Sequence, residues 1–113
     1  MSDQELLYLA AKALGLPLCP EWDAASEGIL IGVGDGDLEV WNPLAIDGEA
    51  MRLMIYLNLV LKECCNSEEC YPQGYGHKKV IEFFSSGKDR AEQFAAARRA
   101  IVRAAAKIGD KLP

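Results

Sequence analysis

The stretch WNPLAIDGEAMRLMIYLNLVL (41–61) is the segment around which we expect the chain to be organised. The residue before a proline is driven to extended backbone, so Asn42-Pro43 should end a strand. Asp47 is a suitable helix N-cap. A helix of about 25 Å is therefore predicted from Gly48 to Cys64.

The helix predicted over 48–64 is apolar around much of its circumference. Its main core face would contain Ala50, Leu53, Met54, Leu57, Val60 and Leu61. Met51, Ile55 and Asn58 form a second stripe beside it, close to Trp41. A helix this apolar is normally covered on more than one side, by another helix or by another subunit. Asn58 would either set the register of a subunit interface or bond to a loop at the edge of the core.

Local signals mark the elements before this stretch. Ser2 and Glu5 form a capping box for a helix that ends near Leu14, where Gly15 supplies a left-handed stop. Residues 16–28 contain two prolines and are expected to form a loop that Trp22 attaches to the core. The segments 28–33 and 38–41 alternate in hydropathy around an Asp-Gly turn, which predicts a β-hairpin.

The second half contains an irregular segment, a strand and a long helix. Residues 65–77 are polar and carry proline and glycine, with room for a short strand at 71–75. A strand is predicted at 78–84. The last helix should run from Arg90 to Ile108 and end at Gly109. Its core face would contain Phe94, Ala97, Ile101, Ala104, Ala105 and Ile108.

The predicted order of elements is α-β-β-α-β-β-α within a single domain, 1–113. Strands interrupted by helices predict an α+β fold, in which helices sandwich a small antiparallel or mixed sheet as α-β-α layers.

Composition limits the classes of function. The net charge is −5, which argues against a broad phosphate-binding surface, so nucleic acid is not the expected partner. The first residues lack the basic segment of a signal peptide, and no apolar run is long enough to span a membrane. We therefore expect a cytoplasmic protein with reduced thiols.

Cys64, Cys65, Cys70 and His77 are the candidates for metal binding or nucleophilic chemistry. Their spacing does not match the paired pattern of zinc sites, so we predict no metal. A disulfide between Cys70 and Cys64 or Cys65 stays open. No catalytic signature supports a Cys-His nucleophile, so neither a cofactor nor enzyme activity is predicted.

Basic residues recur every four positions on the predicted last helix, at Arg99, Arg103 and Lys107. Such a stripe is either a solvated helix face or a contact for an acidic surface, from phosphate or from another protein.

Three blocks of the chain resemble the phage ABA sandwich domain family of small tailed-phage and prophage proteins. They are 3–15, 41–59 and 96–113, with Trp41-Asn42-Pro43-Leu44, Arg98 to Ala105, and Ile108-Gly109 as the matching positions. The resemblance implies an α-β-α layered fold and a phage origin, and it supplies no catalytic residues. The Cys-rich segment 64–77 lies outside the matching blocks.

Together these observations predict a non-enzymatic phage or prophage accessory protein in the cytoplasm of the bacterial host. It would act by protein binding, through self-association and through a host protein or defence component. The expected interface residues are Trp41, Met51, Ile55, Asn58, Arg99, Arg103 and Lys107. Two alternatives are a nucleic-acid binder that uses the basic face of the last helix, and a small-ligand or metal binder at Cys65–His77.

Overall fold

The computed structural model describes residues 2–16, 18–23, 27–32, 38–64, 66–73, 79–84 and 90–112. Their helices and strands, in chain order, are α1 (Asp3–Leu14), β1 (Leu18–Asp23), β2 (Gly28–Gly32), β3 (Leu38–Trp41), α2 (Asp47–Tyr56), β4 (Leu59–Glu63), β5 (Ser67–Pro72), β6 (Val80–Phe83) and α3 (Arg90–Asp110). Within these ranges, no helix has both the length and the hydropathy needed to cross a bilayer.

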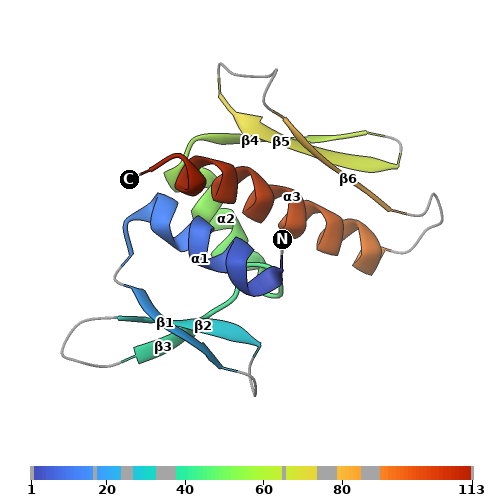
Figure 1. The fold of residues 1–113 in the computed structure, drawn as a ribbon. Coiled ribbons are helices and arrows are strands. Elements are labelled where there is room, and N and C mark those ends of the chain that lie inside the picture. Colours follow the sequence, from blue (N-terminus) through green and yellow to red (C-terminus); the bar gives the residue numbers. More distant parts are fainter. Residues whose placement is uncertain are drawn as a thin grey trace.

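The strands form two antiparallel sheets, ordered β1-β2-β3 and β4-β5-β6. The helices lie between the two sheets, with α3 against the second sheet and α1 against the first (Figure 1). The predicted α+β class, with helices packed on antiparallel strands, is confirmed. The layers differ from expectation in having a second sheet, so that the strands are outermost.

Helix α1 forms as its capping residues predict. The Ser2 hydroxyl accepts the Glu5 N–H at 3.2 Å, and Gly15 has a φ of 73°. The Gly15 and Leu16 N–H groups donate to carbonyls of the last turn, at 3.0 and 3.2 Å. These bonds satisfy groups that a helix end otherwise leaves unpaired.

The expected hairpin is confirmed in its strands, β2 and β3, whose register pairs Ile29 with Trp41. Its turn, with Asp35 and Asp37, lies outside the described residues. The loop predicted at 16–28 is wrong in part, because β1 pairs with β2. A bulge between Cys19 and Trp22 places Pro20 at an irregular point of an edge strand, where a missing N–H does little harm.

The helix predicted at 48–64 is too long. Helix α2 begins at Asp47, with Ile46 rather than Asp47 as N-cap, and ends at Tyr56. The segment 59–63 is instead strand β4, paired with β5, so Ser67–Pro72 of the expected irregular segment is also a strand. A short apolar run such as 57–61 fits a helix and a buried strand equally well, and pairing with β5 decides between them.

Helices α1 and α3 cross at a small residue. Gly109 does not end α3 as predicted but is buried within it. A Cβ at this position would lie 1.9 Å from the Leu9 carbonyl oxygen of α1. The absence of a side chain therefore sets the distance between the two helices. The surrounding core includes Leu6, Leu7, Leu53, Val80, Ile101 and Val102.

The first turns of α3 extend beyond α1 (Figure 1). Phe94 lies in this part and is 53% exposed, so its predicted place in the core is wrong. Ile101, Ala104 and Ala105, two or more turns later, are buried as expected.

Candidate functional site

Trp41 is only 6% exposed and packs in the core, where it pairs with Ile29 across the first sheet. It was predicted as an interface residue. Its burial removes it from the surface, and its role is to anchor the segment that leads into α2.

Asn42 is a buried polar residue that organises this lead-in. Its side-chain oxygen accepts the Leu44 N–H at 3.0 Å, and its amide nitrogen donates to the Glu27 carbonyl. Its backbone N–H donates to the Glu49 carboxylate at 2.7 Å. Arg98 of α3 reaches the same place, donating to the Leu44 carbonyl at 2.8 Å.

Leu44 and Arg98, two positions of the blocks that suggested the resemblance, therefore meet in space. Arg98 also forms an ion pair with Asp47 at 2.8 Å, which ties α3 to the start of α2. The sequence contained a signal for this cluster, because asparagine at the start of a turn commonly bonds to the backbone two residues later. Its partner Arg98, over fifty positions away, had no such local signal.

The outer face of α2 carries three large apolar side chains in solvent. Met51 is 56% exposed, Ile55 65% and Tyr56 67%. Met51 and Ile55 are adjacent because residues four apart share a helix face, whereas Tyr56 lies about 100° further round the last turn of the helix. We call Met51, Ile55 and Tyr56 the α2 surface. It contains two of the predicted interface residues.

Asn58 does not belong to this helical surface. It follows α2 with a φ of 53°, the left-handed conformation that asparagine tolerates better than most residues. Its carbonyl accepts the Gln73 N–H at 2.9 Å, which joins the turn to the end of β5. Its side chain is exposed, so its observed role is to reverse the chain between α2 and β4.

The basic stripe on α3 is largely paired within the molecule. Arg99 lies 3.0 Å from the Asp3 carboxylate and 3.8 Å from Glu82. Arg103 also binds Glu82 and donates to the Ile81 carbonyl at 3.3 Å. Lys107 is exposed and has no ion pair with any residue that the structure describes. Two of the three basic residues of the stripe are therefore already paired within the molecule.

The described cysteines are separated. Burial raises the pKa of the Cys70 thiol to about 12, which keeps it protonated and unreactive. Leu61 lies opposite Cys70 in the ladder, so half-buried Cys64 is displaced by three residues, or about 10 Å. A disulfide requires Cα atoms within about 7 Å, so this fold does not permit a bond between them.

Cys65 and His77 lie outside the described residues. Among the residues that are described, no three His, Cys, Asp or Glu side chains are grouped as metal ligands.

Glu68 is a further buried acid that sequence reasoning missed. It is 4% exposed and lies opposite Glu63 in the ladder. Gln93 of α3 donates to both carboxylates, at 2.7 Å for Glu63 and 3.2 Å for Glu68. Burial, and secondarily the negative charge of Glu63, raise the Glu68 pKa, although the Gln93 bond opposes this.

No protein-family model, curated protein or solved structure matches the chain.

Proposed function

We propose that this protein is a non-enzymatic accessory protein of phage or prophage origin that acts by protein binding in the cytoplasm of the bacterial host. Its first partner is a second copy of the chain, and a host protein or defence component is the second. The observation that carries the proposal is the α2 surface, three large apolar side chains that are each more than half exposed. The phage origin rests on the sequence resemblance alone.

Self-association through the α2 surface is energetically reasonable. Complete burial of a large apolar side chain contributes about 1.5 to 3 kcal/mol, so each of these half-exposed residues offers about 1 to 2 kcal/mol. A two-fold axis uses the same surface twice, which gives about 6 to 12 kcal/mol in total. Association costs about 4 to 15 kcal/mol in lost freedom. The two ranges overlap, so the α2 surface supports at most a weak dimer, which a better-fitting partner could displace.

Sedimentation velocity over a wide concentration range tests the proposal. The unmodified chain should show reversible association, and Ile55→Glu should remove it, because a charge would be buried in the interface. Phe94→Glu is the matched control, since Phe94 is 53% exposed on a different element, α3. It should leave association unchanged. A chain that stays monomeric at about 1 mM, where even a weak dimer should form, contradicts self-association.

A host partner is tested with the same variants. Affinity capture from host lysate should recover a protein that binds the unmodified chain and the Phe94→Glu variant but not Ile55→Glu. Equal recovery by all three variants would place the contact elsewhere on the molecule.

A further inference from the structure

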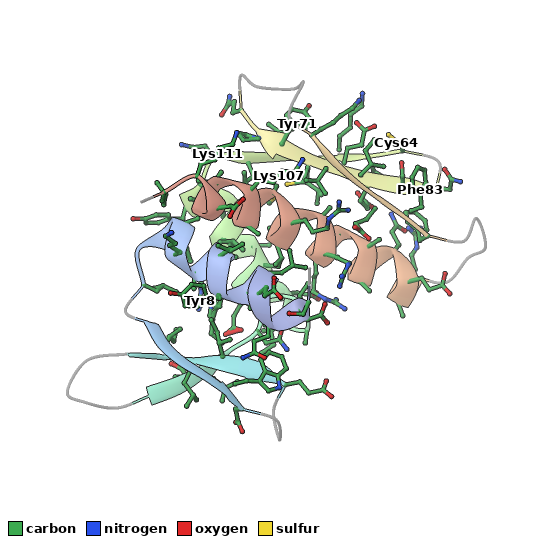
Figure 2. All side chains as sticks on the ribbon, viewed as in Figure 1. Tyr8, Cys64, Tyr71, Phe83, Lys107 and Lys111 are labelled. Atoms are coloured by element: carbon green, nitrogen blue, oxygen red, sulfur yellow. The ribbon has the colours of Figure 1, made fainter. Side chains whose placement is uncertain are left out.

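A second surface lies between α1 and β6. It is a groove of about 360 Å³ against α3, with Leu6 of α1 and Glu82 of β6 among its lining residues. Arg99, Arg103 and Lys107 of α3 also line it. The groove therefore combines two apolar residues, Leu6 and Ala106, with three cations and the two carboxylates of Glu82 and Asp110. Helix α3 runs between α1 and the second sheet in Figure 1, and Figure 2 labels Lys107 on this helix.

Glu82, which lines this groove, belongs to an edge strand. Strand β6 is the last strand of its sheet. The Phe84 N–H donates to the Asn66 carbonyl at 3.0 Å, so alternate residues Glu82 and Val80 also direct their backbone groups toward β5. Ile81 and Phe83 must then direct theirs to the open edge. The bond from Arg103 to the Ile81 carbonyl is consistent with this assignment.

The cations are spaced for an extended chain. Residues four apart on a helix are about 6 Å apart along its axis. Alternate residues of a strand are about 6.6 Å apart, so carboxylates at every second position of a peptide could follow Arg99, Arg103 and Lys107. Arg103 uses one terminal nitrogen for Ile81 and Glu82, and among the described residues its other nitrogens have no bonded partner. They can bind a new carboxylate without loss of these bonds.

We propose that this groove binds an extended acidic segment of a partner protein, which adds as a strand along the edge of β6. Ile81 and Phe83 supply the backbone hydrogen bonds, and Lys107 and the two arginines bind carboxylates at alternate positions. Strand addition to an exposed sheet edge is an established mode of peptide recognition. The open backbone edge favours a peptide over nucleic acid, which has no corresponding row of amide groups. The inference rests on the proposed role in protein binding but uses no residue of the α2 surface.

The test is fluorescence anisotropy with a labelled heptapeptide that has glutamate at alternate positions and valine or threonine between them. Binding should saturate and weaken as salt is added. Lys107→Glu should weaken it at least about tenfold, because one charge-assisted contact is worth about 1.5 to 3 kcal/mol. Lys107 has no ion pair among the described residues, so this variant should fold normally. Lys62→Glu, at an exposed lysine of β4, is the control and should bind as the unmodified chain does.

Two measurements identify strand addition itself. Hydrogen exchange at the Ile81 and Phe83 amides should slow when the peptide binds, and a peptide with methylated backbone nitrogens should lose its affinity. Absence of saturable binding, undiminished binding by the methylated peptide, or equal effects of Lys107→Glu and Lys62→Glu would overturn the proposal. Tighter binding of single-stranded oligothymidine than of the peptide would also overturn it.

The proposals for the groove and for the α2 surface can be refuted independently of each other. Ile55→Glu should leave peptide affinity unchanged, and Lys107→Glu should leave self-association unchanged. A chain that binds the peptide but remains monomeric would refute only the α2 dimer, and the reverse result would refute only the groove.

Discussion

Gly109→Ala should destabilise the protein, although alanine is the better helix former. A Cβ at Gly109 would lie 1.9 Å from the Leu9 carbonyl oxygen, 2.8 Å from its carbon and 3.3 Å from the Ala13 nitrogen. All three atoms belong to the backbone of α1, so no side chain can rotate away. The whole of α1 must shift to accommodate the methyl group.

Two opposing free energies decide the result. Within a helix, alanine is favoured over glycine by about 1 kcal/mol. Against this, ordinary contact begins near 3.4 Å, so relief of the 1.9 Å approach requires a displacement of about 1.5 Å. Overpacking of a rigid core costs about 1 to 3 kcal/mol and sometimes more. Because the obstructing atoms are backbone, we expect the upper end of this range and a net loss of about 2 kcal/mol in the free energy of unfolding.

Urea unfolding followed by circular dichroism measures this loss, and Gly48→Ala is the matched control. Gly48 lies in α2, and no atom lies within 4 Å of the position that an alanine methyl group would take there, so the same substitution should stabilise by up to about 1 kcal/mol. The two variants should therefore shift the unfolding midpoint in opposite directions. If Gly109→Ala is as stable as the unmodified chain or more so, the close crossing of α1 and α3 is refuted.

Three further experiments, two substitutions and one thiol labelling, test the buried groups. Asn42→Ala should lower the free energy of unfolding by about 2 to 4 kcal/mol, because it removes two side-chain hydrogen bonds from a buried position; urea unfolding that shows less than half of this would contradict the role given to Asn42. Glu68→Gln should raise stability at neutral pH. The pKa of Glu68 in the folded state lies above its usual 4.5. Protonated Glu68 therefore stabilises the fold below pH 4.5, and this stabilisation is lost as the pH rises through the folded-state pKa. The gain from Glu68→Gln should therefore disappear near pH 4 in unfolding experiments, and a gain that persists there would have another cause. At pH 8, alkylation mapped by mass spectrometry should modify Cys64 in the folded protein but Cys70 only after unfolding, since burial raises the Cys70 pKa to about 12; rapid labelling of folded Cys70 would disprove its burial.

The predictions that were confirmed depended on short-range chemistry. Ser2 and Gly15 mark the two ends of α1. These ends could be predicted because the hydrogen bonds that form there reach only three to five residues along the chain. Alternating hydropathy around a glycine turn gave the strands of the β2–β3 hairpin for a similar reason. The α+β class follows from such local elements.

The predictions that failed depended on partners distant in the chain. The run 57–63 continues the apolar pattern of α2, and only its pairing with β5 makes it a strand. Gly109 resembles a helix stop when read locally, yet it is the second-last residue of α3 and is buried against α1. The apolar stripe through Met51 and Ile55 was predicted from the sequence. The point at which the stripe ends was not, because Asn58 lies in a left-handed turn after the helix.

The sequence by itself determined the ends of α1, the hairpin strands, the apolar stripe of α2 and the spacing of the basic residues on α3. Each of these depends on residues within about two helical turns of one another. Only the tertiary structure decided which of those features face solvent and what they face. It buried Trp41, offset Arg99 and Arg103 with Asp3 and Glu82, and formed a groove beside the open edge of β6. The physical reason is that contacts between α1, β6 and α3 join residues up to about a hundred positions apart, and no local pattern encodes them.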